Sequence, residues 1–247
     1  MAQQPWFRDW FNSPYYHQLY FERNETEASQ FIDRIIRLLE PAQGSRMLDI
    51  ACGRGRHALS LANKGFDITG IDISPAMIEM AHTLEKENLH FYVHDMRLPF
   101  RINYFQFVFN FFTSFGYFST RREHDDALRT MSSALKPGGR LVLDYLNTGF
   151  AEDHLVHKEK KEMDGVVFYI TRWMDEHHFF KKIEIEDEAL GEPLVFLEKV
   201  SKFSLGDFND MFSYQGIQLM EVYGDYSLNR FELRKSPRLI LLGKKKE

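Results

Sequence analysis

The sequence has almost no cysteine, no long hydrophobic run and no apolar leader. One of its 247 residues is cysteine, which excludes an internal disulfide framework and suits a reducing compartment. No stretch of 18 apolar residues occurs, and residues 1–10 carry Arg8 and Asp9 instead of an apolar signal core. We therefore expect a soluble, cytoplasmic protein that does not engage a membrane.

A strong charge of one sign is also missing. The formal net charge is −5, so the chain lacks the broad basic surface that nucleic acid binding requires, and we expect no nucleic acid partner. The histidines His177 and His178 are adjacent in sequence and have no cysteine cluster beside them, so we expect no metal site. The hydrophobic fraction of 44% predicts a folded core, and the length suits one domain with a small appendage.

Residues 47–57 predict the centre of the site. A short apolar run that contains Asp49 reads as a buried strand, and it ends at the turn Gly53-x-Gly55. Helix-forming residues follow from Ala58. Glycine tolerates unusual backbone angles and lets a ligand approach the backbone closely. A strand, a glycine turn and a helix together indicate a nucleotide-type site.

Two kinds of ligand fit such a turn. Gly53-x-Gly55-x-x-Ala58 matches the dinucleotide fingerprint, in which a pyrophosphate sits on the helix N-terminus. Asp49 ends the preceding strand, where its negative charge opposes a pyrophosphate but suits an ammonium group. The next two apolar runs end at Asp72, placed for the hydroxyls of a ribose, and at Asp95, placed for an adenine amino group. An ammonium, a ribose and an adenine amine without phosphate describe S-adenosylmethionine.

On these residues the chain resembles the class I S-adenosylmethionine-dependent methyltransferases, over about residues 30–145. The family's glycine motif corresponds to residues 48–55, its ribose acid to Asp72 and its adenine-side acid to Asp95. The chain is also similar to the small-molecule branch that contains deoxyamino-sugar N-methyltransferases, through residues 95–97 (Asp-Met-Arg) and, more loosely, residues 112–117. The resemblance implies S-adenosylmethionine as the cofactor and methyl transfer to a small-molecule acceptor.

The expected cofactor-binding residues gather at the strand ends. Met77 follows Asp72 closely enough to flank the adenosine, and the backbone of Asn110 or Phe111 could meet the methionine part. Arg54 and Arg56 either pair with the cofactor carboxylate or are solvated. The predicted set from this part of the chain is Asp49, Ala51, Cys52, Gly53, Gly55, Asp72, Ile73, Met77, Asp95, Met96, Asn110 and Phe111.

Residues 1–24 are rich in aromatic side chains. They are either a segment packed over the domain or a lid that closes over cofactor and acceptor, since aromatic rings suit both stacking and exclusion of water. The sugar methyltransferases carry a Tyr-rich segment of this kind, and the resemblance adds Tyr16 and Tyr20 as cofactor-binding candidates. Methyl transfer to an amine needs no base, whereas a hydroxyl acceptor would want one; the weak catalytic candidates are Tyr16 and His124.

The element pattern predicts an α/β fold with a doubly wound seven-stranded sheet, mostly parallel, whose last strand at residues 238–243 is antiparallel. Within it we expect helices at residues 25–39 and about 121–135, and strands at residues 105–112 and 140–145. Residues 25–145 and 205–247 would form the cofactor-binding domain. Residues 146–204 break the alternation and predict an inserted antiparallel sheet with three strands, at residues 166–173, 179–188 and 194–203. The insertion is either a solvated flap or, as the resemblance implies, a substrate-binding or homodimer-forming element.

Three alternatives stay open. A nicotinamide-dependent (NAD) oxidoreductase is disfavoured by Asp49 and by the lack of a second dinucleotide-binding half. A non-catalytic S-adenosylmethionine-binding module is compatible with the lack of an obvious base. Residues 13–16 (Ser-Pro-Tyr-Tyr) partly match the Pro-Pro-Tyr tetrad of enzymes that methylate amines in nucleic acids, but the second proline is missing.

Overall fold

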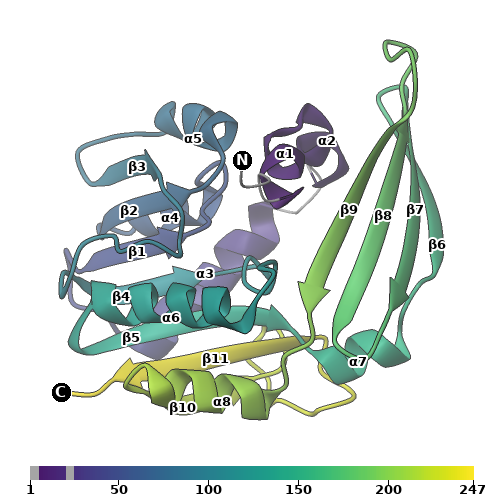
Figure 1. The fold of residues 1–247 in the computed structure, drawn as a ribbon. Coiled ribbons are helices and arrows are strands. Elements are labelled where there is room, and N and C mark those ends of the chain that lie inside the picture. The colour runs from purple at the N-terminus through teal and green to yellow at the C-terminus, as the bar shows by residue number, and fades with distance from the viewer. Residues whose placement is uncertain (1–5, 21–24) are drawn as a thin grey trace.

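The fold is described from a computed structural model, which describes residues 6–20 and 25–247. It contains two separate sheets, one of seven strands and one of four, and two short N-terminal helices lie between them (Figure 1). No helix among the described residues is long and apolar enough to cross a membrane.

The seven-stranded sheet confirms the predicted α/β architecture. Its order is β10-β11-β5-β4-β1-β2-β3, with β1 to β5 mutually parallel and β11 antiparallel to both β5 and β10. The strands are β1 (Arg46–Ile50), β2 (Asp67–Asp72), β3 (Leu89–Val93), β4 (Phe105–Asn110), β5 (Leu135–Leu146), β10 (Ile217–Tyr223) and β11 (Arg238–Lys245).

Helices cover both faces of this sheet, which is why its central strands read as nearly continuous apolar runs. One face packs on α3 (Glu25–Leu39), α4 (Arg56–Ala62) and α5 (Pro75–His82), and the other on α6 (Arg121–Ala134) and α8 (Leu205–Tyr214). The start of α5 follows from local chemistry, because the Ser74 hydroxyl accepts a hydrogen bond from Met77 N at 3.2 Å and Pro75 begins the helix.

Two strand boundaries differ from the prediction. The strand expected at residues 105–112 ends at Asn110, because Phe112 and Thr113 both adopt positive φ values of 57°. The strand expected at residues 140–145 begins at Leu135 and contains Pro137-Gly138-Gly139, with a register irregularity opposite Phe105 and Phe107.

The inserted sheet has four antiparallel strands, so the prediction of three was wrong. It follows α7 (Thr148–Asp153) and consists of β6 (Lys158–Met163), β7 (Val166–Met174), β8 (His178–Glu186) and β9 (Leu194–Ser201). The strand missed by sequence, β6, reads KEKKEM and has one apolar residue. It is the edge strand of this sheet and pairs with β7, and its charged side chains discourage further pairing.

The N-terminal segment forms α1 (Trp6–Asn12) and α2 (Pro14–Tyr20), and residues 1–5 and 21–24 of the predicted lid lie outside the described residues. Both helices lie between the two sheets (Figure 1). Trp10 is fully buried and shares a core cluster with the inner face of the inserted sheet. The two short helices therefore connect the insertion to the main domain.

Candidate functional site

Three carboxylates reach the same edge of the main sheet. Asp49 lies one residue before the end of β1, Asp72 ends β2, and Asp95 follows the end of β3 by two residues. These three strands are adjacent and parallel, so their carboxyl ends meet. The sequence prediction that the acids converge around the glycine turn agrees with this arrangement.

Two adjoining cavities open at this edge and share residues of the glycine turn. The smaller, of about 110 Å³, is lined on the main domain by Asp72, Ile73, Met77, Asp95 and Met96, together with Ala51 and Gly53. The larger, of about 1020 Å³, is lined by Asp49, Cys52 and Phe111, again with Ala51, Gly53 and Met77. Of the predicted cofactor-binding residues, Gly55 and Asn110 line neither cavity.

Asp72 holds the glycine turn in place. Its Oδ2 accepts a hydrogen bond from Gly53 N and its Oδ1 one from Ser74 N, both at 2.9 Å. Burial raises the pKa of Asp72 more than the hydrogen bonds from Ser74, Gly53 and Ile73 lower it. Each carboxylate oxygen has two lone pairs, so accepting one N–H leaves capacity for a ligand hydroxyl on each.

Asp49 is a buried acid with an unsatisfied oxygen. Asp49 is 1% exposed, and its Oδ2 has no hydrogen-bond partner among the described residues. Burial, followed by repulsion from Asp72, raises the pKa of Asp49 to about 7, against the opposing charge of Arg56 and a backbone hydrogen bond from Ala58. A cationic ligand group in the larger cavity would relieve this cost.

The two glycines of the turn do different things. A Cβ at Gly53, where φ is 55°, would meet nothing within 4 Å, so this residue offers open backbone to both cavities. At Gly55, where φ is 80°, a Cβ would lie 2.4 Å from Cζ of Phe91. Gly55 therefore allows the first turn of α4 to pack against the Phe91 ring of β3. It affects the ligand site only through this packing.

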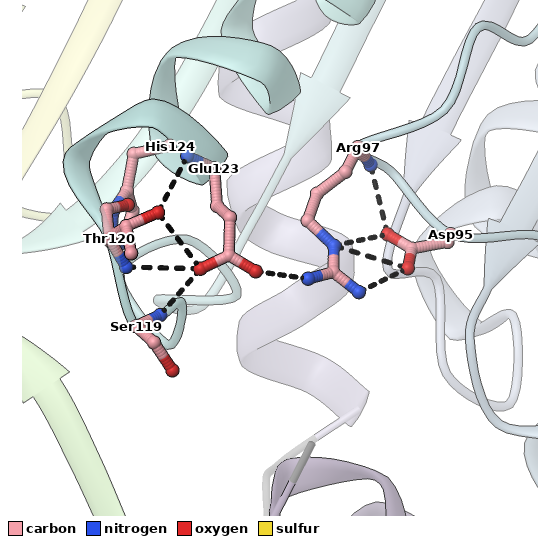
Figure 2. A network of polar contacts seen from close by, with 6 residues as sticks. All are labelled: Asp95, Arg97, Ser119, Thr120, Glu123 and His124. Carbon is pink, nitrogen blue, oxygen red and sulfur yellow. Dashed lines mark hydrogen bonds and ion pairs between the residues drawn. The ribbon is translucent and has the colours of Figure 1, made fainter. Parts of the chain in front are cut away.

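Asp95 is part of a polar network that the sequence did not reveal (Figure 2). Its Oδ1 accepts from Arg97 N at 3.0 Å and its Oδ2 from Arg97 Nη2 at 2.6 Å, while Arg97 Nη1 donates to Glu123 Oε1 at 2.5 Å. Burial opposes ionisation, but the hydrogen bonds and charge of Arg97 outweigh it and lower the pKa of Asp95. Glu123 also caps α6 by accepting from Thr120 N, so the network fixes Asp95 to that helix.

The segment after β4 forms the wall between the cavities. Phe112 and Ser114 line both, and Thr113 lines the smaller one. The strained bend at Phe112 and Thr113 is held by Asp144, whose Oδ2 accepts from Phe112 N at 2.8 Å and whose Oδ1 accepts from Arg238 Nε at 2.8 Å. The predicted residue Asn110 is fully buried and its Nδ2 donates to Ile50 O, so its side chain joins β4 to β1.

The aromatic N-terminal residues line the site from the opposite side. Tyr16 and Tyr20 of α2 line both cavities, and Phe7 and Phe11 of α1 line the smaller one. An acid from the insertion, Glu198 of β9, also lines the smaller cavity. The sequence analysis missed Glu198, although its alternation with Phe196 and Val200 indicated an acid on a packed face.

His124, one of the two weak catalytic candidates, lines neither cavity. It is 1% exposed and lies among the rings of Phe115, Phe118 and Phe203, with Nδ1 hydrogen-bonded to Thr120 O at 2.8 Å. Desolvation lowers the pKa of His124. It is a core residue, because the first turn of α6 faces the aromatic cluster rather than the site. Tyr16, the other candidate, does line the cavities.

Comparisons with known proteins agree with this geometry. A family model described as a methyltransferase domain matches residues 47–139. The chain is 30% identical over 170 residues to a tRNA U34 carboxymethyltransferase of Cellvibrio japonicus, which covers 65% of this chain and 51% of that protein. It is 34% identical over 120 residues to the dTDP-3-amino-3,4,6-trideoxy-alpha-D-glucopyranose N,N-dimethyltransferase of Streptomyces venezuelae, covering 48% of each.

A solved structure shares nearly the whole fold. An S-adenosylmethionine-dependent methyltransferase from Clostridium acetobutylicum superposes with a TM-score of 0.79 at 16% identity, over 94% of this chain and 96% of that one. The fold is that of the class I S-adenosylmethionine-dependent methyltransferases, and residues 47–139 match a methyltransferase domain. The chain spans about half the length of the curated relatives it matches.

Proposed function

We propose that this protein transfers a methyl group from S-adenosylmethionine to a small-molecule acceptor. The observation that carries the proposal is the smaller cavity, which is roofed by α1 and α2 and is bounded by acids and aromatic rings. Among the described residues that line it there is no Lys or Arg. Such a cavity suits a cationic cofactor and a compact acceptor, and excludes bulk water.

The residues present fit the cofactor. The unsatisfied Oδ2 of Asp49 is placed to accept from an ammonium group, and Asp72 retains acceptor capacity for two ribose hydroxyls. Asp95 is held at the cavity wall by Arg97, where it can accept from an adenine amino group, and Met77 and Ile73 supply apolar contact. When bound, S-adenosylmethionine supplies an electrophilic methyl group on a sulfonium. The chain contributes by orienting the reactants and keeping water out.

A nucleic acid acceptor is the competing possibility, since some relatives are named for tRNA. Proteins that bind nucleic acid neutralise phosphates with Lys and Arg, and single-stranded bases then stack on aromatic rings. Among the described residues the smaller cavity is lined by aromatic rings and acids and by no Lys or Arg, and the net charge of the chain is −5. These features favour a small molecule over tRNA.

We also propose that the outer face of the inserted sheet joins two copies of the chain. Its centre exposes Tyr169, Val195, Leu197 and Trp173, at 38%, 54%, 45% and 38%. The strand register places mainly acids at one end of this face and lysines at the other, so a two-fold rotation would bring opposite charges together. The charged residues are Glu162, Glu184 and Glu186, with Lys160 among them, at one end, and Lys158, Lys182 and Lys199 at the other.

Labelled cofactor tests the function. The protein is incubated with S-adenosylmethionine carrying a labelled methyl group, in parallel with a low-molecular-weight metabolite extract and with total tRNA. We expect label in a small molecule and S-adenosylhomocysteine as the co-product, with Asp72→Asn as the inactive control. Label in tRNA alone would contradict the proposed acceptor class.

Analytical ultracentrifugation tests the dimer, with Leu197→Glu expected to give monomers.

A further inference from the structure

Glu198 joins the inserted sheet to both N-terminal helices. It lies in β9, is 7% exposed, and its Oε1 accepts hydrogen bonds from Trp10 Nε1 and Tyr20 Oη, both at 2.7 Å. The two donors come from different helices, Trp10 from α1 and Tyr20 from α2. One buried carboxylate oxygen therefore holds both helices at once, and hydrogen bonds to a charged acceptor are the stronger kind.

A second residue of the sheet supports the same tyrosine. Lys181 of β8 lies directly opposite Glu198 in the strand register, and its Nζ is 3.8 Å from Glu198 Oε2. Nζ of Lys181 also donates to the Tyr20 hydroxyl and lies 4.5 Å from the centre of the Tyr20 ring. The buried charge of Glu198 is thus balanced by a neighbouring cation, which lowers the cost of burying it.

Apolar contacts around Glu198 also join the inserted sheet to the N-terminal helices. Trp10 is fully buried, and its ring lies 4.6 Å from that of Phe196, the residue two positions before Glu198. Trp10 also packs edge-to-face on Tyr16 at 5.4 Å. The Tyr16 ring, which lines both cavities, therefore rests on a tryptophan that Glu198 holds, and the Tyr20 ring packs on Tyr16 at 4.9 Å.

The opposite side of the helices contacts the cofactor-side wall. The Ser74 hydroxyl, which follows Asp72 by two residues, donates to Asn12 Oδ1 at 2.6 Å. Phe7 lies edge-to-face on Phe118 at 6.0 Å. The two helices thus bridge the sheets, and the contacts around Glu198 are both buried and charged.

We propose that Glu198 is a positioning residue for methyl transfer, which holds α1 and α2 over the cavities and keeps Tyr16 and Tyr20 against the bound ligands. The inserted sheet then acts as the fixed support of the roof. Release of the roof should let the cofactor escape faster, and this consequence rests on the proposed function. The roof contact itself can be measured without any ligand.

The test uses three variants of the full chain. Glu198→Leu removes the acceptor, Glu198→Gln keeps one side-chain oxygen that can accept from both donors, and Tyr15→Phe is the matched control. Tyr15 donates to Asp187 at 2.8 Å, which is also a bond between α2 and the insertion, but Tyr15 lines neither cavity. Amide hydrogen exchange over residues 10–20 reports the roof, and stopped-flow dissociation of S-adenosylmethionine reports its effect on the site.

We expect Glu198→Leu to raise exchange over residues 10–20 at least tenfold and to speed cofactor dissociation by a similar factor. Glu198→Gln should stay within threefold of wild type and Tyr15→Phe within twofold, a rescue pattern that loss of general stability would not produce. Unchanged exchange or unchanged dissociation in Glu198→Leu would overturn the proposal, as would equal effects of Glu198→Leu and Tyr15→Phe.

If Glu198→Leu also raises exchange across β1 and β4, the variant has lost its fold and Trp10→Phe decides instead. That change removes the indole N–H and keeps a ring, and we expect at least threefold faster exchange over residues 10–20; no change there would overturn the proposal. A wild-type protein that binds no S-adenosylmethionine would refute the proposed function alone, because the exchange experiment still tests the roof.

Discussion

The Asp49 side chain should lower the free energy of unfolding of the cofactor-free protein and should tighten cofactor binding. Burial and the charge of Asp72 raise the pKa of Asp49 from 3.8 to about 7. The folded state therefore holds a proton that the unfolded state releases, and stability declines as pH rises from 3.8 toward 7. A difference of about three pKa units corresponds to roughly 4 kcal/mol at full ionisation.

Asp49→Asn removes that cost, since the amide keeps the shape and the oxygen that accepts from Ala58 N. At pH 8 we expect the variant to be about 2 to 4 kcal/mol more stable than wild type in urea unfolding, and at pH 4 nearly equal to it. Asp210→Asn, the same change at an exposed position of α8, is the control and should alter stability by less than about 0.5 kcal/mol. A gain that is the same at both pH values would refute the reasoning.

The same variant should bind S-adenosylmethionine less tightly. A protonated Asp49 must lose its proton before it can pair with an ammonium, so the wild-type dissociation constant should fall by up to about tenfold per pH unit between pH 5.5 and 7. Asp49→Asn should lose about 2 to 3 kcal/mol of binding and show a flat profile, since a charged hydrogen bond is missing. Calorimetric titration at several pH values measures both, and a wild-type profile without slope would contradict the assignment.

Two further predictions concern the glycine turn and its acid. Asp72→Ala should weaken S-adenosylmethionine binding by about 2 to 4 kcal/mol, because a charge-assisted pair is lost; an unchanged dissociation constant in calorimetry would remove the assignment. Gly55→Ala should lower the free energy of unfolding by about 2 to 4 kcal/mol, since its Cβ meets the Phe91 ring in a left-handed conformation. Gly53→Ala should cost only about 1 to 2 kcal/mol, and equal losses in urea unfolding would contradict the distinction.

Much of the main domain was predictable because its signals are local. Apolar runs with an acid at the end predicted β1, β2 and the segment after β3. Because the carboxyl ends of parallel strands always meet at one edge of a sheet, these acids were expected to lie close together. Helical periodicity predicted α3 with the bounds that the structure shows.

What escaped prediction depends on contacts between distant segments. Glu198 and Trp10 are 188 positions apart, and nothing in their local sequence shows that one accepts from the other. The roles of Asp144 and Arg238 at the bend after β4 are equally non-local. The buried position of His124 escaped prediction for the same reason, since its helix was predicted but the aromatic cluster that His124 faces involves Phe203, far along the chain. The edge strand β6 lacks an apolar pattern altogether.

One calorimetric comparison tests the central claim most directly. The wild-type chain is titrated with S-adenosylmethionine, S-adenosylhomocysteine and NAD(H) under identical conditions, with Asp72→Ala alongside. We expect saturable binding of the two adenosyl ligands, weakened in Asp72→Ala, and no measurable binding of NAD(H). Tight binding of NAD(H) with none of S-adenosylmethionine would contradict the account.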